Sequence, residues 1–311
     1  MTISSFPRGV PSDPGKRNFP DAAWADPGLL ASHEKWQLDP GAIFVGGTEG
    51  TPLGIHDDRH LMTVAGSRSG KGRSVIIPNL CVYCGSVMAI DPKGDLATVT
   101  AARRGQGSEH CEGLGQEVFV LDPFKVAQGN ARDYRAGFNP LDAIDPHGED
   151  GRDDAALLAD ALIIPSQTDT HWTDAARQFL TGLILHICES ADEKTRNLIQ
   201  MRRLLTADQD GFTTLLAEMS LSEAANGVVA RAANAIIAMA DRERSGVIST
   251  CIVQTEFFDS PAMQSVLSKS DFSLRDLKDR PCTVYLSLPA GRMGTHSRWL
   301  RLMIALTIEA M

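Results

Sequence analysis

The segment AGSRSGKGRS, residues 65–74, has the residue types and the spacing of a loop that binds phosphate groups. In such a loop, consecutive backbone N–H groups and the positive end of the next helix face the phosphates, and a lysine adds a point charge. The expected lysine is Lys71, which we take as the catalytic cation. The remaining expected phosphate-binding residues are Gly66, Ser67, Arg68, Ser69, Gly70, Gly72 and Arg73.

Two positions depart from the common pattern G-x-x-x-x-G-K-[S/T]. Ala65 replaces the first glycine, which is acceptable if its φ is negative. Gly72 replaces the hydroxyl residue that ligates Mg²⁺. Ser74 follows two residues later, about 200° around an α-helix, so we expect it to point away from the phosphates. The alternative is a glycine-rich turn without a ligand.

Two aspartates are candidates for the metal. Asp91 and Asp122 each follow an apolar run that is typical of a buried strand. The carboxyl ends of parallel strands face the ligand crevice, so both carboxylates could reach a metal or its waters. Asp91 is our candidate for a catalytic role and for Mg²⁺ held through water. The alternative for both is a turn former before proline, as in DPK and DPF.

Several apolar segments predict the elements that position these residues. GAIFVGG (41–47) predicts an edge strand and GKGRSVIIPNL (70–80) a short helix that Pro78 ends or kinks. KGDLATVTAARR (93–104) predicts a second helix. Buried strands are predicted for HLMTVAG (60–66), SVMAID (86–91), EVFVLDP (117–123) and CTVYLSLPA (282–290). Strands joined by helical crossovers predict an α/β fold with a mostly parallel sheet.

A long helical block interrupts this pattern. Spacing and alanine content predict helices over residues 152–164, 173–190, 195–206, 208–220, 222–240 and, after the last strand, 297–311. An all-helical block between strands of one sheet is an insertion. We therefore expect an irregular arm over 1–40, a first part of a nucleotide-binding domain over 41–150, a mostly helical insertion over 151–260, and a return to the nucleotide-binding domain over 261–311.

Composition gives few constraints on function. The 311 residues are 43% hydrophobic and carry a net charge of −9, which neither supports nor excludes a nucleic-acid partner. Six cysteines without a signal peptide indicate reduced thiols and no structural disulfides. For Cys81 and Cys84 in CVYC we expect core packing in preference to half of a metal or redox site. No apolar run is long enough to predict a membrane span.

The motifs together resemble a known family. The segments GSRSGKGRSVIIPNL, GSVMAIDPKGDL, VFVLDPF, GFNPLDAI, HWTDAARQFLTGLILHI and SDFSLRDLKDRPCTVYLSLP occur in this order. The series is similar to the TraG-like coupling proteins of type IV secretion and bacterial conjugation, and covers about residues 40 to 305. In that family a glycine often follows the loop lysine. Asn139, Pro140 and Trp172 match family positions that we interpret as structural.

The resemblance implies a RecA-like P-loop NTPase with an inserted all-α domain, which uses ATP and Mg²⁺. It implies a homo-hexamer at the cytoplasmic face of the bacterial inner membrane, which passes relaxase-bound single-stranded DNA or secreted proteins to the type IV secretion channel. An arginine of one subunit then faces the γ-phosphate of the next. Arg242 and Arg244 are candidates, with solvated surface arginines as the alternative.

The resemblance also suggests what this sequence lacks. Family members usually begin with a pair of membrane helices, and after the last helix seen here they continue into a strand that ends in an acidic pair. That pair polarises the hydrolytic water, so we expect weakened nucleotide binding and slow or absent hydrolysis for this chain. The alternatives to a DNA-transfer motor are a non-hydrolysing nucleotide-binding or adaptor fragment and a related ring DNA translocase.

Overall fold

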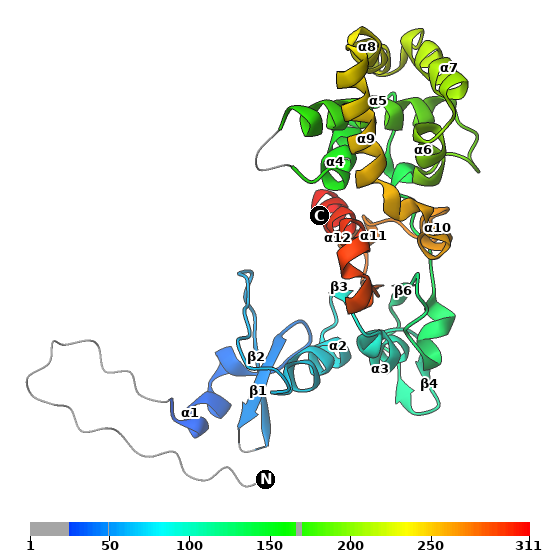
Figure 1. The fold of residues 1–311 in the computed structure, drawn as a ribbon. Helices are drawn as coiled ribbons and strands as arrows, with labels where there is room; N and C mark the ends of the chain where they lie inside the picture. The colour runs from blue at the N-terminus through cyan, green and yellow to red at the C-terminus, as the bar shows by residue number, and fades with distance from the viewer. Residues whose placement is uncertain (1–24, 49, 166–169) are drawn as a thin grey trace, which may run out of the picture. The chain divides into compact units, whose positions relative to one another are not determined.

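The computed structural model describes residues 25–48, 50–165 and 170–311, which form parts of two compact units. The first unit is Met1–Tyr83 and the second is Cys84–Met311, and each is described by itself (Figure 1). Most of the expected irregular arm, including Trp24, lies outside the described residues. Its last part is not irregular, because it contains the helix α1 (Pro27–Ser32) and the 3₁₀ turn η1 (Glu34–Trp36).

A β-hairpin organises the first unit. The expected edge strand is β1 (Ile43–Thr48), and it pairs antiparallel with β2 (Thr51–Ile55), which the sequence did not lead us to expect. The register shifts between Phe44 and Gly46, where the hairpin contains a bulge. The two strands thus form a two-stranded sheet.

The predicted buried strand over residues 60–66 is wrong. This segment has no strand structure, and its apolar side chains are exposed: Leu61 by 51%, Met62 by 87% and Val64 by 81%. An apolar sequence becomes a strand only where a neighbour pairs with its backbone. In the described part of the first unit, β1 and β2 form a two-stranded sheet with which residues 60–66 do not pair, so the segment has no such neighbour.

The helix after the loop begins as a π-helical turn, η2 (Gly72–Ile76), and continues as α2 (Ile77–Val82). We had expected Pro78 to end or kink this helix, and it does not end it. Pro78 is the second residue of α2, directly after the π-helical turn, and its ring has no N–H to donate there.

The side chain of Asn79 joins the helix to the hairpin. Asn79 Oδ1 accepts a hydrogen bond from the N–H of Phe44 at 2.8 Å, and its Nδ2 donates to the Phe44 carbonyl at 2.8 Å. The amide thereby pairs with β1 as a neighbouring strand would. This contact positions the helix at whose start the loop lies.

A three-stranded parallel sheet lies in the second unit. Its order is β3 (Val87–Ile90), β7 (Cys282–Leu286) and β6 (Glu117–Leu121), with β7 in the centre. All five residues of β7 are buried, whereas β3 is an edge strand that is only half-buried. The parallel sheet confirms the predicted α/β class. Because β6 and β7 are adjacent in space but separated by the helical block in sequence, that block is inserted between them.

A buried polar network joins the sheet to α3 (Asp95–Arg104). Arg104 is fully buried, and its guanidinium donates to Thr283 Oγ1 on β7 and to Gln116 Oε1. Thr283 also donates to Gln116 at 2.8 Å. Buried polar groups are tolerated when they are hydrogen-bonded in this way.

The short strands β4 (Gly107–Ser108) and β5 (Cys111–Glu112) form a second hairpin after α3.

The helical block gathers at one end of the second unit (Figure 1). Its helices are α4 (Gly151–Leu162), α5 (His171–Ser190), α6 (Leu198–Leu205), α7 (Gln209–Ser220), α8 (Ala224–Ala238), α9 (Asp241–Gln254) and α10 (Pro261–Leu267). The chain continues through α11 (Asp276–Asp279) to β7 and closes with α12 (Met293–Ala310). Four 3₁₀ turns also lie in this unit: η3 (Gly129–Tyr134), η4 (Pro140–Ala143), η5 (Glu256–Asp259) and η6 (Ala290–Arg292).

Helix α5 is the centre of the block and contacts α4, α6, α8 and α9. Twelve of its residues, from Thr173 to Cys188, are buried. One continuous hydrophobic core includes Leu183 on α5, Leu286 on β7 and Trp299 on α12. The block and the sheet therefore share a core within this unit.

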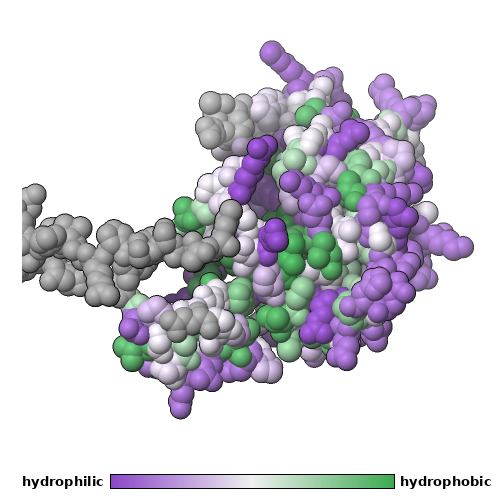
Figure 2. Space-filling view, turned by 90° about the horizontal axis from the view of Figure 1, so that it is seen from below, coloured by the Kyte–Doolittle hydropathy of each residue, from purple (hydrophilic) through white to green (hydrophobic). Residues whose placement is uncertain are grey.

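Core packing was expected for Cys81 and Cys84. Cys81 is half-buried, but Cys84 is exposed, so the expectation is wrong for Cys84. Cys188, Cys251 and Cys282 are buried, and burial raises the pKa of their thiols to about 12, about 12 and about 11. On the face drawn in Figure 2, hydrophilic residues (purple) and hydrophobic residues (green) are interspersed.

Candidate nucleotide-binding loop

The loop begins in an exposed turn of the first unit. The Ser69 N–H donates to the Gly66 carbonyl at 3.4 Å, and two residues have positive φ, Arg68 at 61° and Gly70 at 90°. The φ of Ala65 is not positive, and a residue with a Cβ favours this conformation. Gly66 has no positive φ either, so it is not needed to relieve strain beside Ala65.

The loop has backbone donors available for an anion. The N–H groups of Ser67, Arg68 and Gly70 make no hydrogen bond to any other described residue. A Cβ built on Gly66 or Gly72 meets nothing within 4 Å, so the space beside both glycines is open. Free amides next to open space, at the start of a helix, are the donor set that phosphate requires.

Lys71 occupies the position expected for the cation of this loop. Its ammonium donates to the carbonyl of Ala65 at 2.6 Å and to that of Gly66 at 2.9 Å. The side chain thus folds back over the loop that precedes it. A phosphate placed on the loop amides would compete with these two carbonyls for the ammonium group.

Ser74 lies one helical turn after Gly70. Its N–H donates to the Gly70 carbonyl at 2.8 Å, and its Oγ lies 3.4 Å from the position that a Cβ on Gly70 would take. The hydroxyl therefore lies beside Gly70 of the loop. That it points away from bound phosphates stays a prediction.

Asp91 lies in the second unit, directly after β3, and is buried. Its Oδ2 accepts a hydrogen bond from the N–H of Ala97 at 2.9 Å. Burial raises the pKa of this carboxyl, and hydrogen bonds from backbone N–H groups oppose the shift. The geometry is that of a side chain that holds the turn into α3, which was our alternative for this residue.

Asp122 has a similar environment after β6. Its two oxygens accept hydrogen bonds from the N–H groups of Val126 and Ala127, both at 2.9 Å, and Arg135 lies 3.4 Å away. Both aspartates therefore order the turns at the carboxyl edge of the sheet.

These two turns touch each other through Gly94. Its φ is +71°, and a Cβ there would lie 2.6 Å from the backbone N of Ala127. Only glycine combines this conformation with so close an approach. The motif DPKG thus brings the turns after β3 and β6 together.

Arg242 and Arg244 lie in the first turn of α9, in the inserted block. Arg244 pairs with Asp241 at 2.5 Å on the same helix. Arg242 is exposed and forms no ion pair with a described residue. The structure therefore distinguishes the two candidates, since only Arg242 has no carboxylate beside it in the described part of the chain.

Asn139 and Trp172 have the structural roles that we expected. Asn139 Oδ1 accepts from the N–H of Leu141 at 3.2 Å, and its Nδ2 donates to the Arg196 carbonyl at 2.8 Å. Trp172 lies in the first turn of α5 and packs on Gly246 of α9. Asn79 and Arg104 are structural residues that the sequence analysis missed, because their hydrogen bonds join segments that are distant in sequence.

No helix in the described ranges is both long enough and apolar enough to cross a membrane.

Comparison with known proteins assigns the sequence to a family. Residues 22–311 match the family model described as type IV secretory system conjugative DNA transfer. The conjugal transfer protein TraG of Agrobacterium fabrum is 25% identical over 264 residues, which are 83% of this chain and 38% of TraG. The type IV secretion system-coupling protein VirD4 of Bartonella henselae is 23% identical over 331 residues, 98% of this chain and 50% of VirD4. The chain thus spans half or less of the length of these two relatives.

Solved structures of the conjugative coupling protein TrwB have the same fold. A form of TrwB in complex with sulphate superposes with a TM-score of 0.63 at 13% identity, covering 96% of this chain and 62% of that chain. TrwB in complex with ADP and Mg²⁺ superposes with a TM-score of 0.59 at 14% identity, covering 92% of this chain and 60% of that chain. The fold is therefore the predicted α/β, RecA-like P-loop NTPase fold. Since the family model matches almost the whole sequence, the chain belongs to the conjugative DNA-transfer family of type IV secretory systems.

Proposed function

We propose that this chain is the nucleotide-binding part of a coupling protein that uses ATP to drive the transfer of DNA or protein through a type IV secretion system. The observation that carries the proposal is the loop at residues 65–72, which combines free backbone amides, open space and a lysine within a chain of this family. The complexes of TrwB with ADP and Mg²⁺ and with an ATP analogue support ATP as the nucleotide and Mg²⁺ as its metal.

The loop residues have separate roles in this proposal. The amides of Ser67, Arg68 and Gly70 hold the phosphates, with Ser69, Gly66, Gly72 and Arg73 completing the cradle. Lys71 leaves the carbonyls of Ala65 and Gly66 and neutralises phosphate charge. Bound ATP·Mg²⁺ supplies a phosphoanhydride whose cleavage releases free energy. Asp91 orders the turn after β3, and it remains our candidate for a residue that holds Mg²⁺ through water.

The larger assembly is also part of the proposal. We place a nucleotide-binding domain over residues 41–150 and 261–311 and an inserted all-α domain over 151–260. The full-length protein forms a homo-hexamer at the cytoplasmic face of the inner membrane, where it receives relaxase-bound single-stranded DNA or a secreted protein. Arg242, which has no carboxylate partner among the described residues, is a better candidate than Arg244 for contact with a neighbouring subunit's nucleotide.

Replacement of Lys71 tests the nucleotide site. We expect Lys71→Ala to weaken binding of a fluorescent ATP analogue by at least about tenfold, because the loop loses the ammonium group that neutralises phosphate charge. The matched control is Lys35→Ala, an exposed lysine of the same unit, which should bind as the unchanged chain does. Equal binding by the Lys71 and Lys35 variants would contradict the proposal.

A second candidate function is a nucleotide-binding adaptor that does not hydrolyse ATP. It is favoured by the contacts of the two strand-end aspartates, since Asp91 and Asp122 both use carboxylate oxygens to accept backbone N–H groups. Phosphate release separates the two functions. ATP turnover that Lys71→Ala abolishes would exclude the adaptor, whereas nucleotide binding without turnover would support it.

A further inference from the structure

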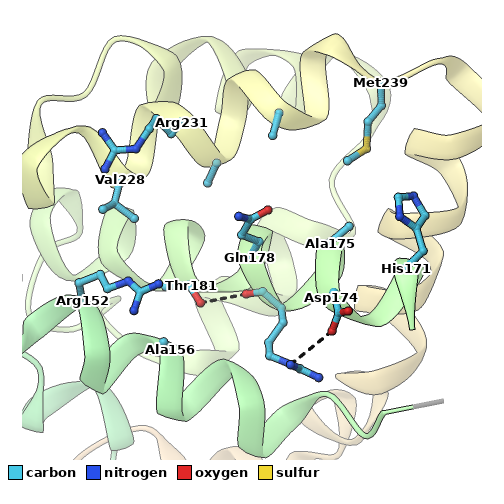
Figure 3. A pocket seen from close by; sticks show the side chains of 13 residues that line it. Arg152, Ala156, His171, Asp174, Ala175, Gln178, Thr181, Val228, Arg231 and Met239 are labelled. Carbon is cyan, nitrogen blue, oxygen red and sulfur yellow. Dashed lines mark hydrogen bonds and ion pairs between the residues drawn. The ribbon is translucent and has the colours of Figure 1, made fainter. Parts of the chain in front are cut away.

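A cavity of about 750 Å³ lies within the inserted helical block, between α8 on one side and α4 and α5 on the other (Figure 3). Its lining mixes apolar and cationic side chains. The apolar part consists of small residues together with Val228 and Met239. The volume is in the range of sites that bind small molecules or a few residues of a peptide.

Three arginines from three different helices line this cavity: Arg152 of α4, Arg177 of α5 and Arg231 of α8. The carboxylate among the lining residues is that of Asp174. In Figure 3, Arg152 and Arg231 lie at one end of the cavity on facing helices, while Asp174 and His171 lie at the other end. The cavity therefore has a cationic end.

The two arginines at this end are only weakly neutralised. Arg231 forms no ion pair with a described residue, and its Nη1 donates to the carbonyl of Asn226 at 3.0 Å. Arg152 pairs with its neighbour Asp153, but both side chains are exposed, by 61% and 73%. Exposed pairs of this kind contribute little stability, so the guanidinium of Arg152 can exchange its partner at low cost.

Arg177, by contrast, serves the structure. It lies 3.3 Å from Asp160 and 3.4 Å from Asp174, so its charge is balanced. Its Nε is buried and makes no hydrogen bond to a described residue, because the contact with Asp160 lacks hydrogen-bond geometry. The recognition of an anion therefore falls to Arg152 and Arg231.

We propose that the cavity between α4, α5 and α8 binds an acidic peptide segment of a partner protein, with carboxylates on Arg152 and Arg231 and separate apolar side chains against Val228 at one end of the cavity and Met239 at the other. Paired guanidinium groups suit carboxylates because each presents a planar fork of donors. Methionine adapts its shape to different apolar groups. The proposal does not rest on nucleotide binding, which occurs on the loop of the first unit.

The lining favours a peptide over a nucleic acid. Proteins that bind single strands stack the bases on aromatic rings. Phe, Tyr and Trp are absent from the described lining, and the ring of His171 lies at the end away from Arg152. An apolar wall beside two cations instead matches a chain that alternates acidic and apolar side chains.

The probe is a fluorescein-labelled peptide in which glutamate alternates with leucine, and its control has glutamine at every glutamate position. The full chain should bind the glutamate peptide with a Kd below about 1 mM and the glutamine peptide at least about tenfold more weakly. Arg152→Gln combined with Arg231→Gln should weaken binding of the glutamate peptide by at least about tenfold. The control Arg203→Gln, an exposed arginine of α6 outside the cavity, should leave binding within about twofold.

Three results would overturn the proposal. They are the absence of saturable binding, equal binding of the two peptides, and an equal loss of affinity in the Arg203 control. Displacement of the peptide by oligothymidylate, with a loss of oligothymidylate binding in the double variant, would instead assign the cavity to nucleic acid. If Arg231→Gln lowers the unfolding temperature, the single variant Arg152→Glu replaces the double variant in the test and should likewise weaken binding of the glutamate peptide. Arg152 suits this purpose because it is exposed and pairs only with Asp153 among the described residues. Nucleotide binding, measured in the same samples, shows separately whether the proposed function holds.

Discussion

Lys71, the proposed phosphate-binding cation, is engaged by the protein itself. Two carbonyls of its own loop hold the ammonium. Hydrogen bonds to charged groups contribute about 1.5–3 kcal/mol each when they are buried, and less in an exposed loop such as this one. In the proposed binding mode a nucleotide replaces these contacts, so part of its interaction energy is used to release the lysine.

His186 is a second residue at which environment controls charge. It is buried in α5, and this burial lowers the pKa of its imidazole, although Glu218 opposes the shift. The unfolded chain therefore binds more protons than the folded one as pH falls below about 6.5, and the free energy of unfolding decreases there. Urea unfolding at a series of pH values should show this decrease between pH 7 and pH 5.

The variant His186→Leu isolates the contribution of this residue. Without the imidazole, the slope of the free energy of unfolding against pH should be smaller in this range, because leucine does not titrate. His296, whose pKa burial also lowers, would account for part of the slope that remains. An unchanged slope in the variant would contradict the interpretation.

At the scale of elements, close contacts decide which residue types a helix can carry. Gly246 of α9 lies against Trp172 of α5, and a Cβ at Gly246 would come within 2.6 Å of the indole ring. A glycine inside a helix normally lowers stability by about 0.5–1 kcal/mol relative to alanine. Here the glycine permits two central helices of the block to approach.

Alanine replacements at two helical glycines test this argument. Gly246→Ala should lower the free energy of unfolding by about 1–3 kcal/mol, because the new methyl group overlaps the ring of Trp172. Gly294→Ala in α12 should leave stability unchanged or raise it by up to about 1 kcal/mol, since nothing lies within 4 Å of its Cβ position. Chemical unfolding of both variants gives the comparison, and a stabilised Gly246 variant would show that the ring moves freely.

At the scale of the molecule, the hydrophobic core runs from the parallel sheet into the helical block of the second unit. Leu286 of β7 and Leu183 of α5 are both fully buried in it. A core that extends through two layers couples their unfolding. The inserted block therefore behaves as part of this unit and not as a separate body on a linker.

Two core replacements should affect the same unfolding transition. Leu286→Ala and Leu183→Ala remove buried methyl groups from the sheet and from the block, and each should lower the free energy of unfolding by about 2–5 kcal/mol. Hydrogen exchange should show faster amide exchange in both the sheet and α5 for either variant. Exchange that rises only near the replaced residue would mean that the two layers unfold independently.

The sequence by itself determined the class of fold and the position of the loop. Local patterns were sufficient there, because the apolar runs at Val87–Ile90, Glu117–Leu121 and Cys282–Leu286 and the spacing of Gly70 and Lys71 are properties of short segments. The family resemblance rests on the same segments, and the family match confirms it.

Only the tertiary structure decided the contacts of those residues. Residues 60–66 are as apolar as a strand, yet none of the described strands of the first unit pairs with them, and the helix after the loop begins as a π-helical turn that α-helical periodicity does not predict. The cavity beside Arg152 and Arg231 also escaped the sequence, because it joins helices that are distant along the chain. Propensity and spacing are local properties, so the sequence alone could reveal them. Pairing, packing and cavities depend on residues far apart in sequence, so only the tertiary structure could reveal those.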